Sequence, residues 1–132
     1  MKRLIDNGFR PVGRWTMLDG CIRIALTELA NVSNILYAFV ANDEVLYVGK
    51  TTQKLQARLY GYQNPGPRQS TNIKANHLIS ELLNAGQSVE ILALPDNGLL
   101  RFGIFHLNLA AGLEDSIVRT IRPKWNRIGK NR

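Results

Sequence analysis

The sequence predicts an α+β fold in which a small antiparallel sheet is flanked by helices. β-prone stretches flank two tight-turn pairs, Asp19-Gly20 and Asn42-Asp43, which is typical of β-hairpins. A helical pattern over residues 73–85 is followed by a short apolar run, which indicates a further strand. We therefore expect a three-stranded core from residues 35–41, 45–48 and 89–94, with an N-terminal hairpin added to it.

Length and composition indicate a single domain of ordinary polarity. The 132 residues suffice for one hydrophobic core, and 45% of them are apolar and 20% charged. We expect residues 1–33 to form an N-terminal extension and residues 34–132 to form the main domain. The single Cys21 excludes an internal disulfide and a cysteine-based zinc site. No apolar run is long enough to span a membrane and no signal-peptide core is found, so we expect no membrane partner and a cytoplasmic location.

The charge is unusually positive for a chain of this size. The formal net charge is +7 and the pI is about 10.0. A small basic domain is most often attracted to a polyanion, and nucleic acid is the commonest one. Solubility alone, or an enzyme acting on small anions, are the alternatives that the charge leaves open.

The N-terminal extension is basic and contains the first hairpin. Pro11 and Gly13 argue against one long helix, and apolar residues alternate from Trp15 to Leu26 around the Asp19-Gly20 turn. The extension could cover the edge of the main sheet, build an oligomer interface or contact DNA. Arg14 is its candidate for DNA contact.

The second hairpin and the helix after it bring several polar side chains together. Tyr37 and Tyr47 lie one on each strand, and Lys50 follows the second strand. Arg58 and Tyr62 are four residues apart and share one face of the helix. Phenol, ammonium and guanidinium groups that converge near the start of a helix can bind a phosphate. The alternative is that the strand tyrosines serve only packing.

The boundaries of this helix and of the next follow from local signals. Gly49 is expected to break the second strand, and Thr51 or Thr52 to cap a helix that runs to about Tyr62. Residues 63–72 predict an exposed loop in which Arg68 can touch a phosphate backbone. The helix of residues 73–85 ends at Gly86, carries Lys74 and His77 near its start, and is expected to bury Ile73, Leu78, Ile79, Leu82 and Leu83.

The C-terminal third is harder to assign. Residues 99–111 fit neither a strand nor a helix pattern, so we expect a partly irregular, buried connection that includes His106. Residues 112–121 predict a helix with Glu114 in its first turn, halted by Arg122-Pro123. Lys124 and Arg127 then belong to a basic end that attracts phosphate.

Together these pieces resemble the GIY-YIG nuclease superfamily. Its first signature is matched by Ile35-Leu36-Tyr37, with isoleucine in place of the family's glycine, and its second by Tyr47-Val48-Gly49, with Lys50 after it. The family's arginine and aromatic residue on the first helix are matched by Arg58 and Tyr62. Its later glutamate, Arg-Pro pair and asparagine are matched in order and spacing by Glu114, Arg122-Pro123 and Asn126. The resemblance covers residues 35–126.

The resemblance implies a restriction-like DNA endonuclease that hydrolyses phosphodiester bonds in double-stranded DNA. It implies that this activity depends on Mg²⁺, with Mn²⁺ as a possible substitute. It also implies a homo-oligomer, either a dimer or a tetramer. Glu114 would bind the metal and Arg58 would hold the scissile phosphate. Tyr37 would be the general base, with Tyr47 as its rival and Lys50 assisting. Tyr62 would bond a phosphate oxygen or orient Tyr37, and Asn126 would fix Glu114 or the tyrosine pair.

Two other classes of protein would use the same features. A structure-specific repair or recombination nuclease would act on branched or damaged DNA, and a non-catalytic module would bind DNA without cutting it. A small-molecule enzyme is disfavoured by the charge and by the lack of a cofactor motif. The candidate DNA-contacting residues for any of these are Arg14, Arg68, Lys74, His77, Lys124 and Arg127.

Overall fold

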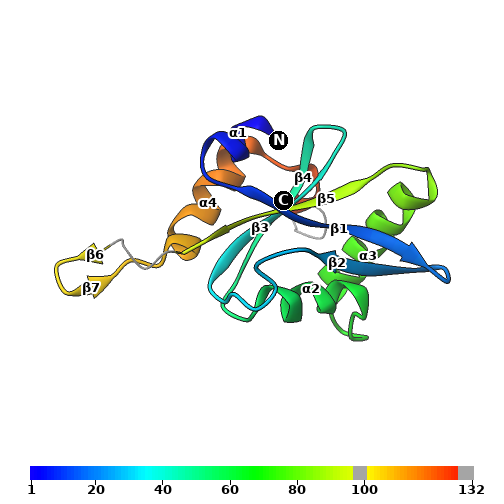
Figure 1. Cartoon of the computed structure of the whole chain (residues 1–132), viewed down its shortest axis with the longest axis horizontal. Helices are drawn as coiled ribbons and strands as arrows, with labels where there is room; N and C mark the ends of the chain where they lie inside the picture. The colour runs from blue at the N-terminus through cyan, green and yellow to red at the C-terminus, as the bar shows by residue number, and fades with distance from the viewer. Residues whose placement is uncertain (97–100, 128–132) are drawn as a thin grey trace.

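Five antiparallel strands form one sheet that carries helices on both faces (Figure 1). The computed structural model describes residues 1–96 and 101–127. The strand order is β2-β1-β5-β3-β4, so β5 is central and β4 is an edge strand. The expected α+β fold with an antiparallel sheet is confirmed. The bounds of the sheet strands are β1 Arg10–Leu18, β2 Cys21–Leu26, β3 Ile35–Ala41, β4 Glu44–Thr51 and β5 Val89–Pro95.

The N-terminal hairpin belongs to the same sheet as the three expected core strands. Strand β1 pairs with β5 along one side, while β3 pairs with β5 along the other. The hairpin therefore covers the strand edge that β5 would otherwise expose. Whether it also contacts DNA or a second subunit stays a prediction.

Both predicted hairpin turns have the backbone that their sequences favour. Asp19 and Gly20 have φ angles of 53° and 78°, and Asn42 and Asp43 have φ angles of 52° and 61°. Two consecutive residues with positive φ define the type I′ turn, whose twist matches that of the paired strands. Asn, Asp and Gly tolerate this backbone, so these pairs set the registers of β1 with β2 and of β3 with β4.

The two faces of the sheet bury different halves of the core. Ile35, Tyr37 and Phe39 of β3 pack toward one face, together with residues of α2 and α3. Leu36, Ala38 and Val40 pack toward the other face, together with residues of α1 and α4. Every residue of β3 is buried because helices cover both of its faces. The helices are α1 Lys2–Asp6, α2 Leu55–Gln63, α3 Ser70–Asn84 and α4 Leu109–Ile121, with a 3₁₀ turn η1 over Lys124–Arg127. None of the helices within the described residues is both long and apolar enough to cross a bilayer.

Gly49 does not break its strand, contrary to the prediction. Strand β4 continues through Gly49, which pairs with Tyr37 on β3. A Cβ atom on Gly49 would lie 2.6 Å from the hydroxyl oxygen of Tyr37, so the glycine leaves room for that phenol. The predicted caps Thr51 and Thr52 are also wrong, because α2 begins after Lys54 without a side-chain cap. The Thr51 hydroxyl instead accepts a hydrogen bond from the backbone N–H of Gln53, at 3.0 Å.

Two later helices begin three residues earlier than predicted. Helix α3 begins at Ser70 and turns Ile73 outward, where its side chain is 36% exposed, so the expectation that Ile73 is buried is wrong. The predicted helix end is confirmed, since Gly86 follows the C-cap with a φ of 81°. Because α4 begins at Leu109, Glu114 lies in its second turn and not in its first. The short helix α1 was not predicted.

The expected buried connection over residues 99–111 is wrong for residues 101–107, which are exposed, whereas Ala110 is buried as expected. Residues 97–100 lie outside the described part of the chain, and the next residues form a small hairpin of β6 (Arg101–Phe102) and β7 (Phe105–His106). Figure 1 shows this hairpin projecting from the body of the molecule. Its apolar residues are exposed, because a two-stranded ribbon has no second layer to pack against.

The close contact between Gly49 and Tyr37 predicts a specific loss of stability. Gly49→Ala should lower the free energy of unfolding by about 1–3 kcal/mol, because the new methyl group displaces a buried ring that has no free space. Chemical denaturation followed by circular dichroism measures the change.

Gly112→Ala is the matched control. A Cβ atom on Gly112 meets nothing within 4 Å, and the residue lies inside α4. The change should therefore stabilise the protein, by about 0.5–1 kcal/mol. Equal effects of the two substitutions would contradict the packing account of Gly49.

Candidate active site

A cluster of aromatic rings lies beside Arg58 at the candidate site. Phe39 lies at its centre, with ring centroids of Tyr37, Tyr47 and Tyr62 at 5.7, 5.7 and 5.4 Å. These rings come from β3, β4 and α2, so the cluster joins the sheet to the first helix after it. Edge and tilted contacts of this kind add to the apolar burial and fix the ring positions.

The hydroxyl groups of two tyrosines meet inside this cluster. The Tyr37 and Tyr62 oxygens are 2.7 Å apart, and the Arg58 Nη2 atom donates to the Tyr62 oxygen at 2.9 Å. The guanidinium carbon of Arg58 also lies 4.4 Å from the ring centroid of Tyr62. The four-residue spacing on α2 thus brings Arg58 onto Tyr62, and through it to Tyr37.

Asn72 holds the other side of the guanidinium. Both terminal nitrogens of Arg58 lie 3.4 Å from the Asn72 Oδ1 atom. The Asn72 amide nitrogen donates to Gln69 at 3.2 Å, and its side chain is only 8% exposed. The guanidinium is therefore clamped between α2 and α3 before any ligand arrives.

Sequence reasoning missed Asn72, although a signal was present. Asn72 lies three and seven positions before Ala75 and Ile79, which form the buried stripe of α3. A polar residue at the first position of a buried stripe needs a buried hydrogen-bond partner. Arg58 is that partner, but nothing local in the sequence names it.

Burial controls the protonation of the phenols. Burial raises the pKa of Tyr37, the neighbouring Tyr47 raises it further, and Arg58 only partly offsets this. Burial likewise raises the pKa of Tyr62. Burial lowers the pKa of Arg58. The nearby Tyr37, Tyr62 and Tyr47 raise this pKa by more, so the net shift is upward. The site therefore holds a cationic guanidinium beside protonated phenols.

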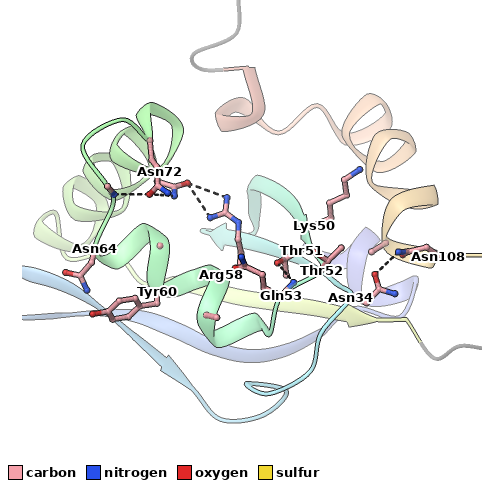
Figure 2. A pocket seen from close by; sticks show the side chains of 15 residues that line it. Asn34, Lys50, Thr51, Thr52, Gln53, Arg58, Tyr60, Asn64, Asn72 and Asn108 are labelled. Carbon is pink, nitrogen blue, oxygen red and sulfur yellow. Dashed lines mark hydrogen bonds between the residues drawn. The ribbon is translucent and has the colours of Figure 1, made fainter.

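A cavity of about 920 Å³ lies next to the contact between Arg58 and Asn72 (Figure 2), and the four clustered rings are not among its lining residues. Arg58 and Asn72 line it from one side, while Lys50, Asn108 and Ala110 line it from the other. In Figure 2, Lys50 points toward α4 and Arg58 points toward Asn72. An ammonium and a guanidinium in one polar cavity favour an anionic ligand with several oxygen atoms.

The cavity lies at the edge of the sheet, where its two faces meet. Tyr47 packs with the core under α2 and α3, whereas Val48 packs with the core under α4. Alternation along β4 then places Lys50 on the α4 side of the sheet. The phenols and the guanidinium therefore lie on one side of the edge strand β4. The Lys50 ammonium lies on the other side, so the strand separates it from the phenols.

Asn126 fixes this edge strand. Its amide oxygen accepts from the Val48 N–H at 2.9 Å and its amide nitrogen donates to the Val48 carbonyl oxygen at 2.8 Å. The side chain thus pairs with β4 as a further strand would, and it protects the open edge. Because Val48 lies next to Tyr47, Asn126 also fixes the backbone that positions that phenol.

Glu114 lies on α4, the helix that bounds the cavity on the Lys50 side. Its side chain is half-buried, and it follows the cavity-lining Ala110 by one turn on the same helix face. No group of three or more His, Cys, Asp or Glu side chains suited to a metal ion occurs among the described residues.

The predicted DNA-contacting residues are spread around the molecule. Arg68 is exposed in the loop between Gly66 and Gln69, both of which line the cavity. Arg14, Lys74, His77 and Lys124 are exposed but lie outside the cavity lining, and the Lys124 ammonium is 3.6 Å from Glu44. The side chain of Arg127 lies outside the described part of the structure.

Comparisons with known proteins locate this fold among nucleases. No protein-family model and no curated protein sequence matches the chain. A solved structure of bacteriophage T4 EndoII, in a glutamate-to-alanine mutant, is 25% identical with a TM-score of 0.72, over 96% of this chain and 98% of that one. Restriction endonuclease HPY188I, solved in complex with product DNA, is 15% identical with a TM-score of 0.53, over 98% of this chain and 84% of that one.

The fold is that of a nuclease. The likeness to T4 EndoII extends over nearly the whole of both chains. It agrees with a sequence resemblance to the small endonuclease II of T-even bacteriophages, which rests on the run YAFVANDEVLYVGKT and on the ending PKWN. The 15% identity with the restriction endonuclease supports the fold alone.

The buried hydroxyl pair predicts that Tyr62 stabilises the protein through its oxygen atom. Tyr62→Phe should lower the free energy of unfolding by about 1–3 kcal/mol, because it leaves the buried Tyr37 hydroxyl and one Arg58 N–H without their shared partner. Denaturant unfolding measures this loss.

Tyr60→Phe is the control on the same helix. Tyr60 is 55% exposed, so its substitution should change the unfolding free energy by less than about 0.5 kcal/mol. The double change Tyr37→Phe with Tyr62→Phe should cost less than the sum of the two single changes. Strict additivity would show that the hydroxyl contact contributes nothing.

Proposed function

We propose that the chain is a divalent-metal-dependent endonuclease that hydrolyses phosphodiester bonds in double-stranded DNA. The observation that carries the proposal is the Arg58 guanidinium, clamped by Tyr62 and Asn72 at the wall of a cavity that Lys50 also lines. A preoriented guanidinium beside an ammonium matches the oxygens of a phosphodiester. The net charge of +7 and the likeness to bacteriophage T4 EndoII point the same way.

Arg58 would stabilise the charge that develops during hydrolysis. The phosphorus acquires a fifth oxygen ligand in the transition state, and its non-bridging oxygens become more negative. Since Arg58 is held in place before the substrate binds, little reorganisation is needed when that charge develops. Lys50 would contact the same phosphodiester, or its neighbour along the strand, from the α4 side of the cavity.

Glu114 is the residue that would hold the metal ion. A single carboxylate, completed by water and phosphate oxygens, is a donor set that suits Mg²⁺, and Mn²⁺ has similar preferences. The bound ion would supply Lewis-acid stabilisation and a more acidic water. Glu114 lies on the same side of the sheet as Lys50, so the carboxylate would approach the phosphate opposite Arg58.

The general base is one of the two strand tyrosines. Tyr37 is 1% exposed, bonded to Tyr62, and has a raised pKa, all of which oppose its loss of a proton in the free protein. Tyr47 is only half-buried and can reach water. Solvent access therefore favours Tyr47, and Tyr37 can serve only if the bound substrate and metal ion lower its pKa.

We also propose that the enzyme prefers certain DNA sequences, acts as a restriction-like nuclease and assembles as a homo-oligomer. Arg68, Lys74, His77, Arg14, Lys124 and Arg127 are the proposed contacts to the DNA backbone. A structure-specific repair nuclease would use the same cavity, and a comparison of plain duplex with branched or flapped DNA separates the two. A module that only binds DNA would leave all of these substrates uncut.

Loss of the carboxylate should abolish cleavage without loss of folding. With supercoiled plasmid and Mg²⁺, Glu114→Ala should lower the cleavage rate by at least ~100-fold, because the metal ion loses its protein ligand. DNA binding, measured by fluorescence anisotropy, should be kept or strengthened because a negative charge is removed. Gel analysis and sequencing of the cut ends report the reaction.

Asp115→Ala is the matched control on α4. Asp115 is exposed and paired with Arg119 one turn away, so its loss should leave cleavage unchanged. A chelator should stop cleavage by the wild type, and Mg²⁺ or Mn²⁺ should restore it. Cleavage that survives either the chelator or Glu114→Ala would refute the metal-dependent mechanism.

Single removal of each phenol oxygen should identify the base. Tyr47→Phe should lower the cleavage rate about 100-fold or more, because it removes the group that would take the proton from the attacking water. Tyr37→Phe should lower the rate less, while it destabilises the fold through the lost contact with Tyr62. Rates are measured on a labelled duplex.

The reverse order of effects would assign the base to Tyr37. Full activity in both variants would place the base elsewhere. Because unfolding is measured on the same samples, a rate lost through instability can be told from a rate lost through chemistry.

A further inference from the structure

Gly61 lies inside helix α2, where a glycine lowers stability. Helix α2 runs from Leu55 to Gln63, so Gly61 belongs to its hydrogen-bonded part. A glycine at such a position is less favourable than alanine, because the unfolded chain has more conformational freedom to lose. The φ angle of Gly61 is not positive, so the backbone itself does not require a glycine there. The residue therefore needs another explanation.

The packing of α2 against α3 does not require this glycine either. Apart from the backbone of its own helix, a Cβ atom on Gly61 would first meet Asn72 Nδ2 at 3.4 Å and Arg58 Nη1 at 3.5 Å. Both are ordinary van der Waals distances, in contrast to the 2.6 Å at Gly49. An alanine therefore fits at position 61, and its methyl group would lie against these two nitrogen atoms.

The same two nitrogen atoms have donor capacity left for a ligand. Each of them carries two N–H groups. Among the described residues, Arg58 Nη1 has one hydrogen-bond partner, the Asn72 Oδ1 atom at 3.4 Å, and Asn72 Nδ2 has one, the Gln69 Oε1 atom at 3.2 Å. Figure 2 shows the contact between Arg58 and Asn72. We define the Gly61 notch as the space over Gly61 beside these two nitrogens, all three residues being part of the cavity lining.

The charges around the Gly61 notch favour an anion. In the part of the chain that the structure describes, no aspartate or glutamate lines the cavity, and none forms an ion pair with Arg58. Asn72 is only 8% exposed, so little water can reach its amide. A buried donor of this kind is stabilised when a ligand oxygen accepts its hydrogen bond. An oxygen atom over Gly61 could accept from both nitrogens at once.

We propose that an oxygen of a phosphodiester binds in the Gly61 notch, and that Gly61 keeps this place open. The oxygen would accept from Arg58 Nη1 and from Asn72 Nδ2. It would approach the Nη1 side of the guanidinium, because both N–H groups of Nη2 are bonded to Tyr62 and Asn72. Asn72 would then bind the substrate in addition to holding Arg58. The identity of the ligand rests on the proposed endonuclease function, whereas the notch as a site for phosphate oxygens does not.

Gly61→Ala should change stability and activity in opposite directions. The melting temperature should rise, because alanine favours the helix and fits the space. The cleavage rate of a DNA duplex with Mg²⁺, at saturating protein, should fall at least ~10-fold, because the methyl group blocks two hydrogen bonds to a charged oxygen. Thermal unfolding followed by circular dichroism and single-turnover cleavage measure the two effects.

Gln56→Ala is the matched control on the same helix. Gln56 is exposed and is not among the residues that line the cavity. Its replacement also adds an alanine to α2, so it should leave the cleavage rate unchanged. A difference between the two variants can therefore be assigned to the Gly61 notch.

Inorganic phosphate tests the notch without DNA or metal. In an NMR titration of the wild type, phosphate should shift the Nε–H signal of Arg58 and the side-chain amide signals of Asn72. Gly61→Ala should raise the dissociation constant for phosphate at least ~10-fold, and Gln56→Ala should not change it. Asn72→Asp should also weaken phosphate binding while it keeps the fold, because it retains an oxygen for Arg58 but replaces the amide donor with a negative acceptor.

Wild-type levels of phosphate binding or of DNA cleavage in Gly61→Ala would overturn the proposal. A lower melting temperature of that variant would also overturn it, since Gly61 would then serve packing. If the wild type cleaves DNA and Gly61→Ala cleaves it equally well, the notch is refuted and the nuclease function stands. If the wild type binds phosphate in the notch but cleaves no DNA, the nuclease function is refuted and the site for phosphate oxygens stands.

Discussion

The hydrogen bond between the Tyr37 and Tyr62 hydroxyls ties the sheet to the helix that carries the guanidinium. The two oxygens are 2.7 Å apart, and the Tyr37 ring lies against Gly49, where a side chain would collide with it. Tyr62 in turn holds Arg58 by a hydrogen bond and by the face of its ring. The position of the guanidinium therefore depends on a glycine in the edge strand, on a phenol in the neighbouring strand and on the spacing of two residues in α2. A change at any of these positions would move the charge that the site needs.

Burial decides which groups in the site carry charge. The phenols of Tyr37 and Tyr62 are desolvated, which raises their pKa values and keeps them as neutral hydrogen-bonding groups. Arg58 stays charged in the same surroundings because its nitrogens are bonded to the Tyr62 oxygen and the Asn72 carbonyl oxygen. The result is a fixed positive charge whose position is set by neutral partners, so a bound anion does not compete with a carboxylate for it. Glu114, on the other side of the edge strand, is separated from that cation by β4.

The edge strand β4 is where the two halves of the site meet. Edge strands are open to pairing with other chains, and Asn126 closes this one by bonding both backbone groups of Val48. The strand is thus held between β3 and a single amide, while its side chains alternate between the aromatic cluster and α4. This explains why one cavity can be lined by Arg58 from one face and by Lys50 from the other. A phosphodiester that enters it would span the thickness of the sheet edge.

Features that depend on residues close together in the chain can be predicted from the sequence. The Asp19-Gly20 and Asn42-Asp43 turns follow from the backbone that these residues tolerate, and the contact of Arg58 with Tyr62 follows from their spacing on a helix. The contacts between distant segments become visible in the folded chain alone: Asn72 with Arg58, Asn126 with Val48, and the pairing of β1 with β5. The tertiary structure also decides that Gly49 makes room for a ring and that residues 101–107 face solvent, because whether an apolar side chain is buried depends on which other element arrives to cover it. Local spacing sets which side chains share a face, but the volume and polarity of the opposing segment set what that face contacts.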